Sequence, residues 1–111
     1  MIYQESNELK KSLKFWYRLP GHYHGSENYS VFAPRLEIIN YYMKELRKYG
    51  WEFIAEEDNV EKSNGKKVEE KYIFRNGTYE LQISFPVETT VNFEGVVYEK
   101  SYYIIVFPIN R

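Results

Sequence analysis

Hydrophobic and polar residues alternate along several short segments of this chain, and a period of two residues is typical of β-strands. The alternation predicts strands over residues 12–19, 51–56, 68–75, 78–85 and 97–107. Strands that follow one another through short turns usually pair antiparallel. We therefore expect an antiparallel sheet.

One segment has the period of a helix instead. Its hydrophobic residues recur every three or four positions, at Leu36, Ile39, Met43 and Leu46. Pro34 suits the first turn of a helix, and Gly50 suits the position just after its end. The stripe predicts one helix of about four turns with a single hydrophobic side.

The dipeptide Asn76-Gly77 predicts a tight hairpin between two of the strands. It is typical of a type I′ turn, in which both central residues need a positive φ. With that turn, the facing pairs are Phe74 with Tyr79, Tyr72 with Leu81, and Val68 with Phe85. All six side chains then share one face, so this face is predicted to be the core side of the hairpin.

The predicted order is β-α-β-β-β-β in a single domain spanning residues 1–111, which is an α+β fold. We expect one helix packed on a four- to five-stranded antiparallel sheet. This order is similar to that of the cystatin-like architecture, in which a sheet wraps a single helix. The inhibitor family's Gln-x-Val-x-Gly loop is absent, because residues 60–65 read Val-Glu-Lys-Ser-Asn-Gly, so the resemblance implies no protease-binding residues here.

A single helix shelters only one face of a sheet, so hydrophobic residues on the other face need a different cover. The residues predicted to lie there and to contact a partner are Trp16, Ile54, Ile73, Tyr103, Ile105 and Phe107. For the last strand, this holds if the preceding loop turns Tyr102, Ile104 and Val106 toward the core. Residues 1–11 and 20–33 are an alternative cover, and a homodimer is the first intermolecular contact to suspect.

Residues 87–97 form a second candidate contact. If Glu94-Gly95 turns the chain, this segment is a β-arm tipped by Phe93, and an exposed arm can accept a strand from a partner. Pro86 favours an ordinary irregular connection instead, because proline disrupts a central strand.

The composition excludes several classes of site. The 111 residues include no cysteine, so disulfides, thiolate zinc sites and a cysteine nucleophile are excluded. The net charge of −1 disfavours binding to nucleic acid. No hydrophobic run approaches the ~18 residues of a membrane span, and residues 1–14 lack the core of a signal peptide, so we expect a cytoplasmic protein. Lys, Asn, Ile and Tyr are frequent, and their codons are rich in A and T. This composition suggests an AT-rich bacterium or its phage as the source.

Few residues offer candidate chemistry. The loop candidates are His22, Tyr23, His24 and Glu27, which suit the mouth of a ligand-binding or hydrolytic pocket, although two solvated histidines are the simpler interpretation. A nucleic-acid contact through Lys14, Trp16 and Arg18 is a further alternative, with the indole stacking on a base. Glu70 shares the core-side parity of the hairpin, so its carboxylate is either buried with a raised pKa or reaches water at the end of the sheet.

These patterns favour a non-catalytic protein-binding module, such as a small inhibitor, an immunity protein or a phage-encoded regulator. Aromatic residues make up 19% of the chain, which suits a contact surface rich in rigid anchors. We expect no catalytic residue, metal or cofactor, and we expect the partner to be another protein or a second copy of the chain.

Overall fold

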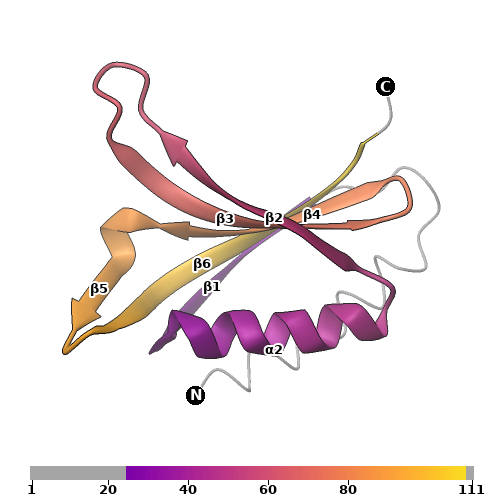
Figure 1. Cartoon of the computed structure of the whole chain (residues 1–111), viewed down its shortest axis with the longest axis horizontal. Helices are drawn as coiled ribbons and strands as arrows, with labels where there is room; N and C mark the ends of the chain where they lie inside the picture. Colours follow the sequence, from indigo (N-terminus) through magenta and orange to yellow (C-terminus); the bar gives the residue numbers. More distant parts are fainter. Residues whose placement is uncertain (1–24, 110–111) are drawn as a thin grey trace.

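The computed structural model describes residues 25–109 and gives an α+β fold, as predicted. Its elements are β1 (Gly25–Pro34), α2 (Arg35–Lys48), β2 (Glu52–Val60), β3 (Lys67–Asn76), β4 (Tyr79–Pro86), the short 3-10 helix η1 (Val87–Thr89), β5 (Thr90–Phe93) and β6 (Val96–Pro108). The sheet is antiparallel with six strands, in the order β1-β6-β4-β3-β2, and β5 pairs with β6 (Figure 1). The predicted sheet of four to five strands was therefore too small.

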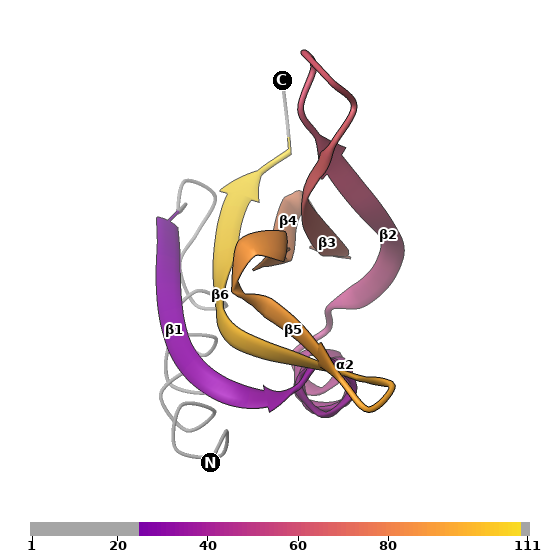
Figure 2. The ribbon, with the colours of Figure 1, turned by 90° about the vertical axis from the view of Figure 1, so that its left-hand side faces the viewer.

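The helix lies at one end of a strongly twisted sheet. Figure 2 shows β1 and β2, the two edge strands of the main strand order, on either side of α2. The β2–β3 hairpin points away from the helix, whereas the end of the β5–β6 hairpin comes close to the start of α2 (Figure 1).

Strand β1 occupies residues that the sequence predicted to be a loop, so that prediction was wrong. Tyr29 and Ala33 are buried, while Asn28 and Ser30 are exposed. The alternation is hard to recognise because β1 is an edge strand among residues 25–109, with Asn28 and Ser30 on its exposed side, and because a bulge after Ser30 shifts the period. The predicted strand over residues 12–19 lies outside the described residues.

The β3–β4 hairpin has the predicted core face but a different register. Phe74 faces Leu81 rather than Tyr79, and Tyr72 faces Ile83 rather than Leu81. Gly77 has a positive φ of 60° and is the first of two loop residues, as a type II′ turn requires. The shift moves each partner by two residues, so every side chain stays on its predicted face.

The segment after β4 is an ordered arm, and the favoured irregular connection was wrong. Pro86 is the last residue of β4, where its lack of a backbone N–H donor costs little strand pairing. The 3-10 helix η1 then leads into β5. Glu94 and Gly95 have φ values of 52° and 81° and join Phe93 to its partner Val96. We call residues 90–99 the β5–β6 arm.

All the buried hydrophobic residues described except Ile73 form one cluster that draws on both the helix and the sheet. From the strands, its members are Tyr29, Ala33, Phe74, Leu81, Ile83, Phe85, Tyr102, Ile104 and Val106, with Trp51 just before β2. The last strand therefore turns its predicted residues inward. From α2, the members are Ile38, Ile39, Tyr42 and Leu46, so the buried side of the helix is rotated from the predicted stripe.

Candidate functional site

A groove lies between the first half of α2 and the β5–β6 arm. Its volume is about 530 Å³, and its hydrophobic lining includes Leu36, Ile39, Met43, Tyr72, Val96 and Val97. The helix supplies one wall and the arm the other, and both views place the end of the arm beside the start of α2 (Figures 1 and 2). We call this the arm–helix groove.

Large hydrophobic side chains stand exposed in this groove and on the β5–β6 arm beside it. Leu36 is 70% exposed, Phe93 is 60% exposed and Val96 is 41% exposed. Phe32, 65% exposed, stacks on Tyr98 of the arm with ring centroids 5.0 Å apart. Soluble domains usually scatter such residues singly, so their concentration here marks a candidate contact surface.

A network of charged side chains anchors the arm to the helix and to β3. Arg35, the first residue of α2, donates from Nε to Glu99 Oε2 at 2.5 Å and from Nη1 to Glu70 Oε1. Glu99 also accepts a hydrogen bond from Thr90 Oγ1 at 2.7 Å, and Glu70 accepts one from Lys67 Nζ at 2.7 Å. Lys67 Nζ also lies 3.8 Å from Asp58 Oδ2, so the network joins two cations and three carboxylates, and Arg35 is its member that lines the groove.

Burial and charge act differently on the two carboxylates. Burial raises the pKa of Glu99, and the hydrogen bonds from Thr90 and Arg35 offset this only in part. Burial also acts to raise the pKa of Glu70, but the hydrogen bond from Lys67 and the charge of Arg35 outweigh it, so the pKa is lowered. Of the two alternatives foreseen for Glu70, the buried one with a raised pKa is therefore wrong.

The sequence reasoning missed Arg35 and Glu99. A signal for Arg35 was present, because a cation in the first turn of a helix is unfavourable unless carboxylates approach it. Its guanidinium also lies over the ring of Phe85, 5.1 Å from the centroid, which fixes the side chain further. Glu99 sits in a strand of hydrophobic and polar residues, and nothing local indicates that its carboxylate is buried.

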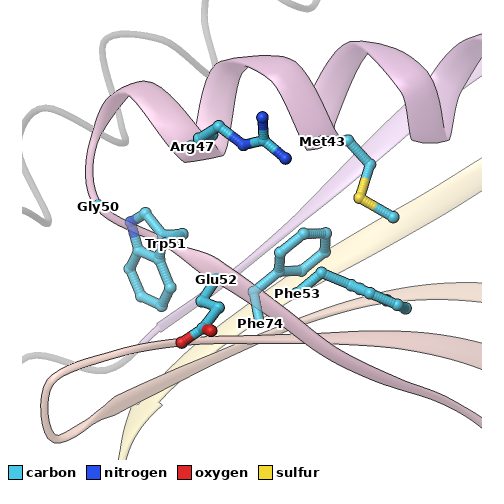
Figure 3. A pocket seen from close by; sticks show the side chains of 7 residues that line it. All are labelled: Met43, Arg47, Gly50, Trp51, Glu52, Phe53 and Phe74. Atoms are coloured by element: carbon cyan, nitrogen blue, oxygen red, sulfur yellow. The ribbon is translucent and has the colours of Figure 1, made fainter.

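A second pocket of about 420 Å³ lies where α2 leads into β2 (Figure 3). Met43 and Arg47 line it from the helix, Phe53 from β2 and Phe74 from β3. Met43 also lines the arm–helix groove, so the two hollows adjoin along one side of α2. We call this second hollow the β2 pocket.

The structure brings together only part of the predicted contact face. Ile73 and Ile105 share a row across β4, with Gln82 between them, and Tyr103 and Phe107 flank that row on the same face. Ile73 is buried and the three β6 residues are half-buried. The polar residues of the central strand β4 that divide this face are Glu80, Gln82 and Ser84.

Two other predicted contact residues lie elsewhere. Ile54 is exposed at a bulge in the edge strand β2, and Phe93 is at the end of the arm. Trp16 lies outside the described residues, as do Lys14 and Arg18. The role of all these residues in partner binding stays a prediction.

The loop candidates His22, Tyr23 and His24 also lie outside the described residues. Glu27 belongs to β1, faces Ile104 of β6 and accepts a hydrogen bond from Tyr29 at 2.7 Å. Across residues 25–109, no three His, Cys, Asp or Glu side chains are grouped so that they could hold a metal ion.

Comparison with known proteins gives no relatives: no family model, no curated protein and no solved structure matches this chain. Within the described part of the chain, no helix has the length and hydrophobicity needed to cross a bilayer. The candidate site therefore rests on its geometry alone.

Proposed function

We propose that this domain is a non-catalytic protein-binding module, and that a protein partner docks in the arm–helix groove and against the arm. The observation that carries the proposal is that Leu36 and Val96, 70% and 41% exposed, line one hydrophobic groove. Two more exposed aromatic residues belong to or contact the adjoining arm: Phe93 pairs with Val96, and Phe32 stacks on Tyr98. A small inhibitor, an immunity protein or a phage-encoded regulator would use such a surface.

The surface has the layout of a protein interface. Burying one exposed Leu or Phe contributes about 1.5–3 kcal/mol, the size of a binding hot spot. Exposed polar side chains stand beside the hydrophobic centre, at Glu37 and Asn40 on the helix and Glu94 on the arm. A hydrophobic centre with a polar rim is the usual anatomy of a contact between two proteins.

The buried ionic network supports a rigid surface. Arg35 and Glu99 link the start of α2 to the arm, so both walls of the groove are held in a fixed relation. A preformed groove loses little conformational entropy when it binds.

Three further points stay proposals. The joint cluster of helix and sheet side chains supports a cystatin-like arrangement in which the sheet wraps α2. The sheet face with Ile73, Tyr103 and Ile105 is a second possible contact, including one between two copies of the chain. The cytoplasm is the compartment that we propose.

Capture of the partner from the native host tests the proposal. The tagged domain is compared with a Leu36→Lys/Val96→Lys variant, and with a Val68→Lys/Val87→Lys control that changes two exposed valines outside both the groove and β2. We expect the same partner with the wild type and the control, and at least tenfold less with the groove variant, after circular dichroism has shown that all three are folded. Equal recovery with the groove variant would refute the proposed site.

A further inference from the structure

Strand β2 is an edge of the sheet within the described part of the chain. It pairs with β3 on one side only, so alternate residues turn their N–H and C=O groups outward. Bulges interrupt the pairing after Phe53 and after Asn59. Between the bulges, residues 55–59 pair regularly with β3 and offer a straight edge to a further strand.

The charged residues of β2 are all acidic, and one of them, Asp58, has the Nζ of Lys67 in β3 3.8 Å from its Oδ2. The charged residues of β2 are Glu52, Glu56, Glu57 and Asp58, with no lysine or arginine among them. Glu56 and Asp58 stand on one face because they are two residues apart, and they lie opposite Tyr72 and Glu70 of β3. A strand added at this edge would place the Cβ atoms of its own alternate residues about 5 Å from the Cβ atoms of Glu56 and Asp58.

Self-association through this edge is unfavourable. Two antiparallel copies of β2 centred on Glu57 would place Glu56 of one copy opposite Asp58 of the other, and each Glu57 opposite its own equivalent. Like charges directly opposite each other destabilise strand pairing. The occupant that fits is a basic segment, because the same carboxylates would then attract rather than repel.

The β2 pocket specifies one more side chain of the occupant. Phe53 lines this pocket at the start of β2 together with Met43 and Phe74, and Arg47 and Glu52 give it a polar side (Figure 3). Phe53 faces Phe74, on the core side of the sheet that Glu56 also shares by facing Tyr72. A strand antiparallel to β2 would therefore carry basic residues toward Asp58 and Glu56 first, and then a large hydrophobic residue toward the pocket.

We propose that β2 accepts an extended segment of a partner protein as an additional antiparallel strand, with Lys or Arg at alternate positions followed by a large hydrophobic residue. Main-chain hydrogen bonds to residues 55–59 would supply affinity, and the carboxylates and the pocket would select the sequence. This site is separate from the arm–helix groove, and either can exist without the other.

The test uses the capped heptapeptide Lys-Val-Lys-Val-Lys-Val-Phe as the probe. Amide hydrogen exchange and NMR titration should show saturable binding, with amide protection confined to β2 and shifts at Phe53 and Phe74. The matched peptide with Glu in place of Lys should bind at least tenfold more weakly. Absence of protection in β2, or equal binding of the acidic peptide, would overturn the proposal.

Two N-methylated versions of the probe separate strand addition from simple charge attraction. N-methyl groups on the three lysines block one edge of the peptide, and N-methyl groups on the three valines block the other. We expect one version to lose binding at least tenfold and the other to retain it. If both bind as well as the parent peptide, the carboxylates merely attract cations and no strand is added.

Variants of the protein complete the test. Glu56→Gln/Asp58→Asn should weaken binding of the probe by roughly 3- to 10-fold, as expected for two partly exposed ion pairs. Glu37→Gln/Glu88→Gln changes the net charge equally at exposed sites elsewhere and should leave binding unchanged. Leu36→Lys/Val96→Lys should also leave it unchanged, since the groove is a different site. Equal losses in the first two variants would contradict a local role for β2.

Discussion

Replacing Arg35 with methionine should destabilise the fold strongly, because it leaves the buried carboxylate of Glu99 without its cation. Glu99 is 0% exposed, and without the guanidinium it keeps only the hydrogen bond from Thr90. Removing one partner of a buried ion pair costs about 3–5 kcal/mol. That is a large fraction of the roughly 5–15 kcal/mol that stabilises a typical domain.

The double variant Arg35→Met/Glu99→Gln is the matched control. It removes both charges, and Glu70 keeps Lys67 Nζ at 2.7 Å, so no buried carboxylate is left without a cation. Replacing both members of a buried pair is often close to neutral. We therefore expect the double variant to be roughly 2 kcal/mol more stable than Arg35→Met alone.

Urea unfolding followed by circular dichroism measures both free energies. For a domain of this size, a loss of 3–5 kcal/mol corresponds to a fall in Tm of about 12–20 °C, which thermal unfolding would show independently. A loss below about 1 kcal/mol for Arg35→Met, or a double variant less stable than the single one, would refute the claim that this ion pair holds the arm to the helix.

Three further predictions concern the stability of the fold. The raised pKa of Glu99 means that the folded state binds more protons than the unfolded state just above the ordinary pKa, so stability falls as pH rises from about 4.5 through the folded value. In urea titrations at several pH values, the free energy of unfolding of Glu99→Gln should not show this decrease. A variant with the same pH profile as the wild type would contradict the assignment of the decrease to Glu99. Gly50→Ala should cost about 1–2 kcal/mol in urea unfolding, because φ is 89° and the new Cβ would lie 3.3 Å from Asn76 Nδ2, and a neutral result would be unexpected. Tyr42→Phe should cost about 1–2 kcal/mol by removing one hydroxyl of the buried hydrogen-bonded pair with Tyr102, and Tyr42→Phe/Tyr102→Phe should recover part of it; additive losses in a double-mutant cycle would argue against that pairing.

The sequence could predict the elements that depend on local periodicity. The helix, the core faces of β3 and β4 and the inward residues of β6 all follow from spacing, because burial imposes a period on consecutive side chains. The II′ turn was missed because Asn76-Gly77 fits a type I′ turn equally well. In the structure, Asn76 instead ends β3, and its side chain donates to the carbonyl of Tyr49 at 3.0 Å.

The candidate site could be predicted only in part. Phe93 and the possibility of an arm were foreseen from the Glu94-Gly95 turn, but the groove depends on the arm meeting α2, and no local pattern encodes that contact. Leu36 looked like a core residue, yet Ile38 and Tyr42 take the buried side of the helix and leave it exposed. The Arg35 network joins residues far apart in the chain, the most distant pair being 64 positions apart.

Photo-crosslinking tests the proposed protein-binding groove most directly. A benzophenone amino acid replaces Leu36 in one protein and, in a control, the exposed Val87, which lies outside both the arm–helix groove and β2, and both are irradiated in cells of the native host. The groove proposal predicts one discrete protein adduct from position 36 and none of that mass from position 87. No adduct from position 36, or the same adduct from both positions, would contradict it.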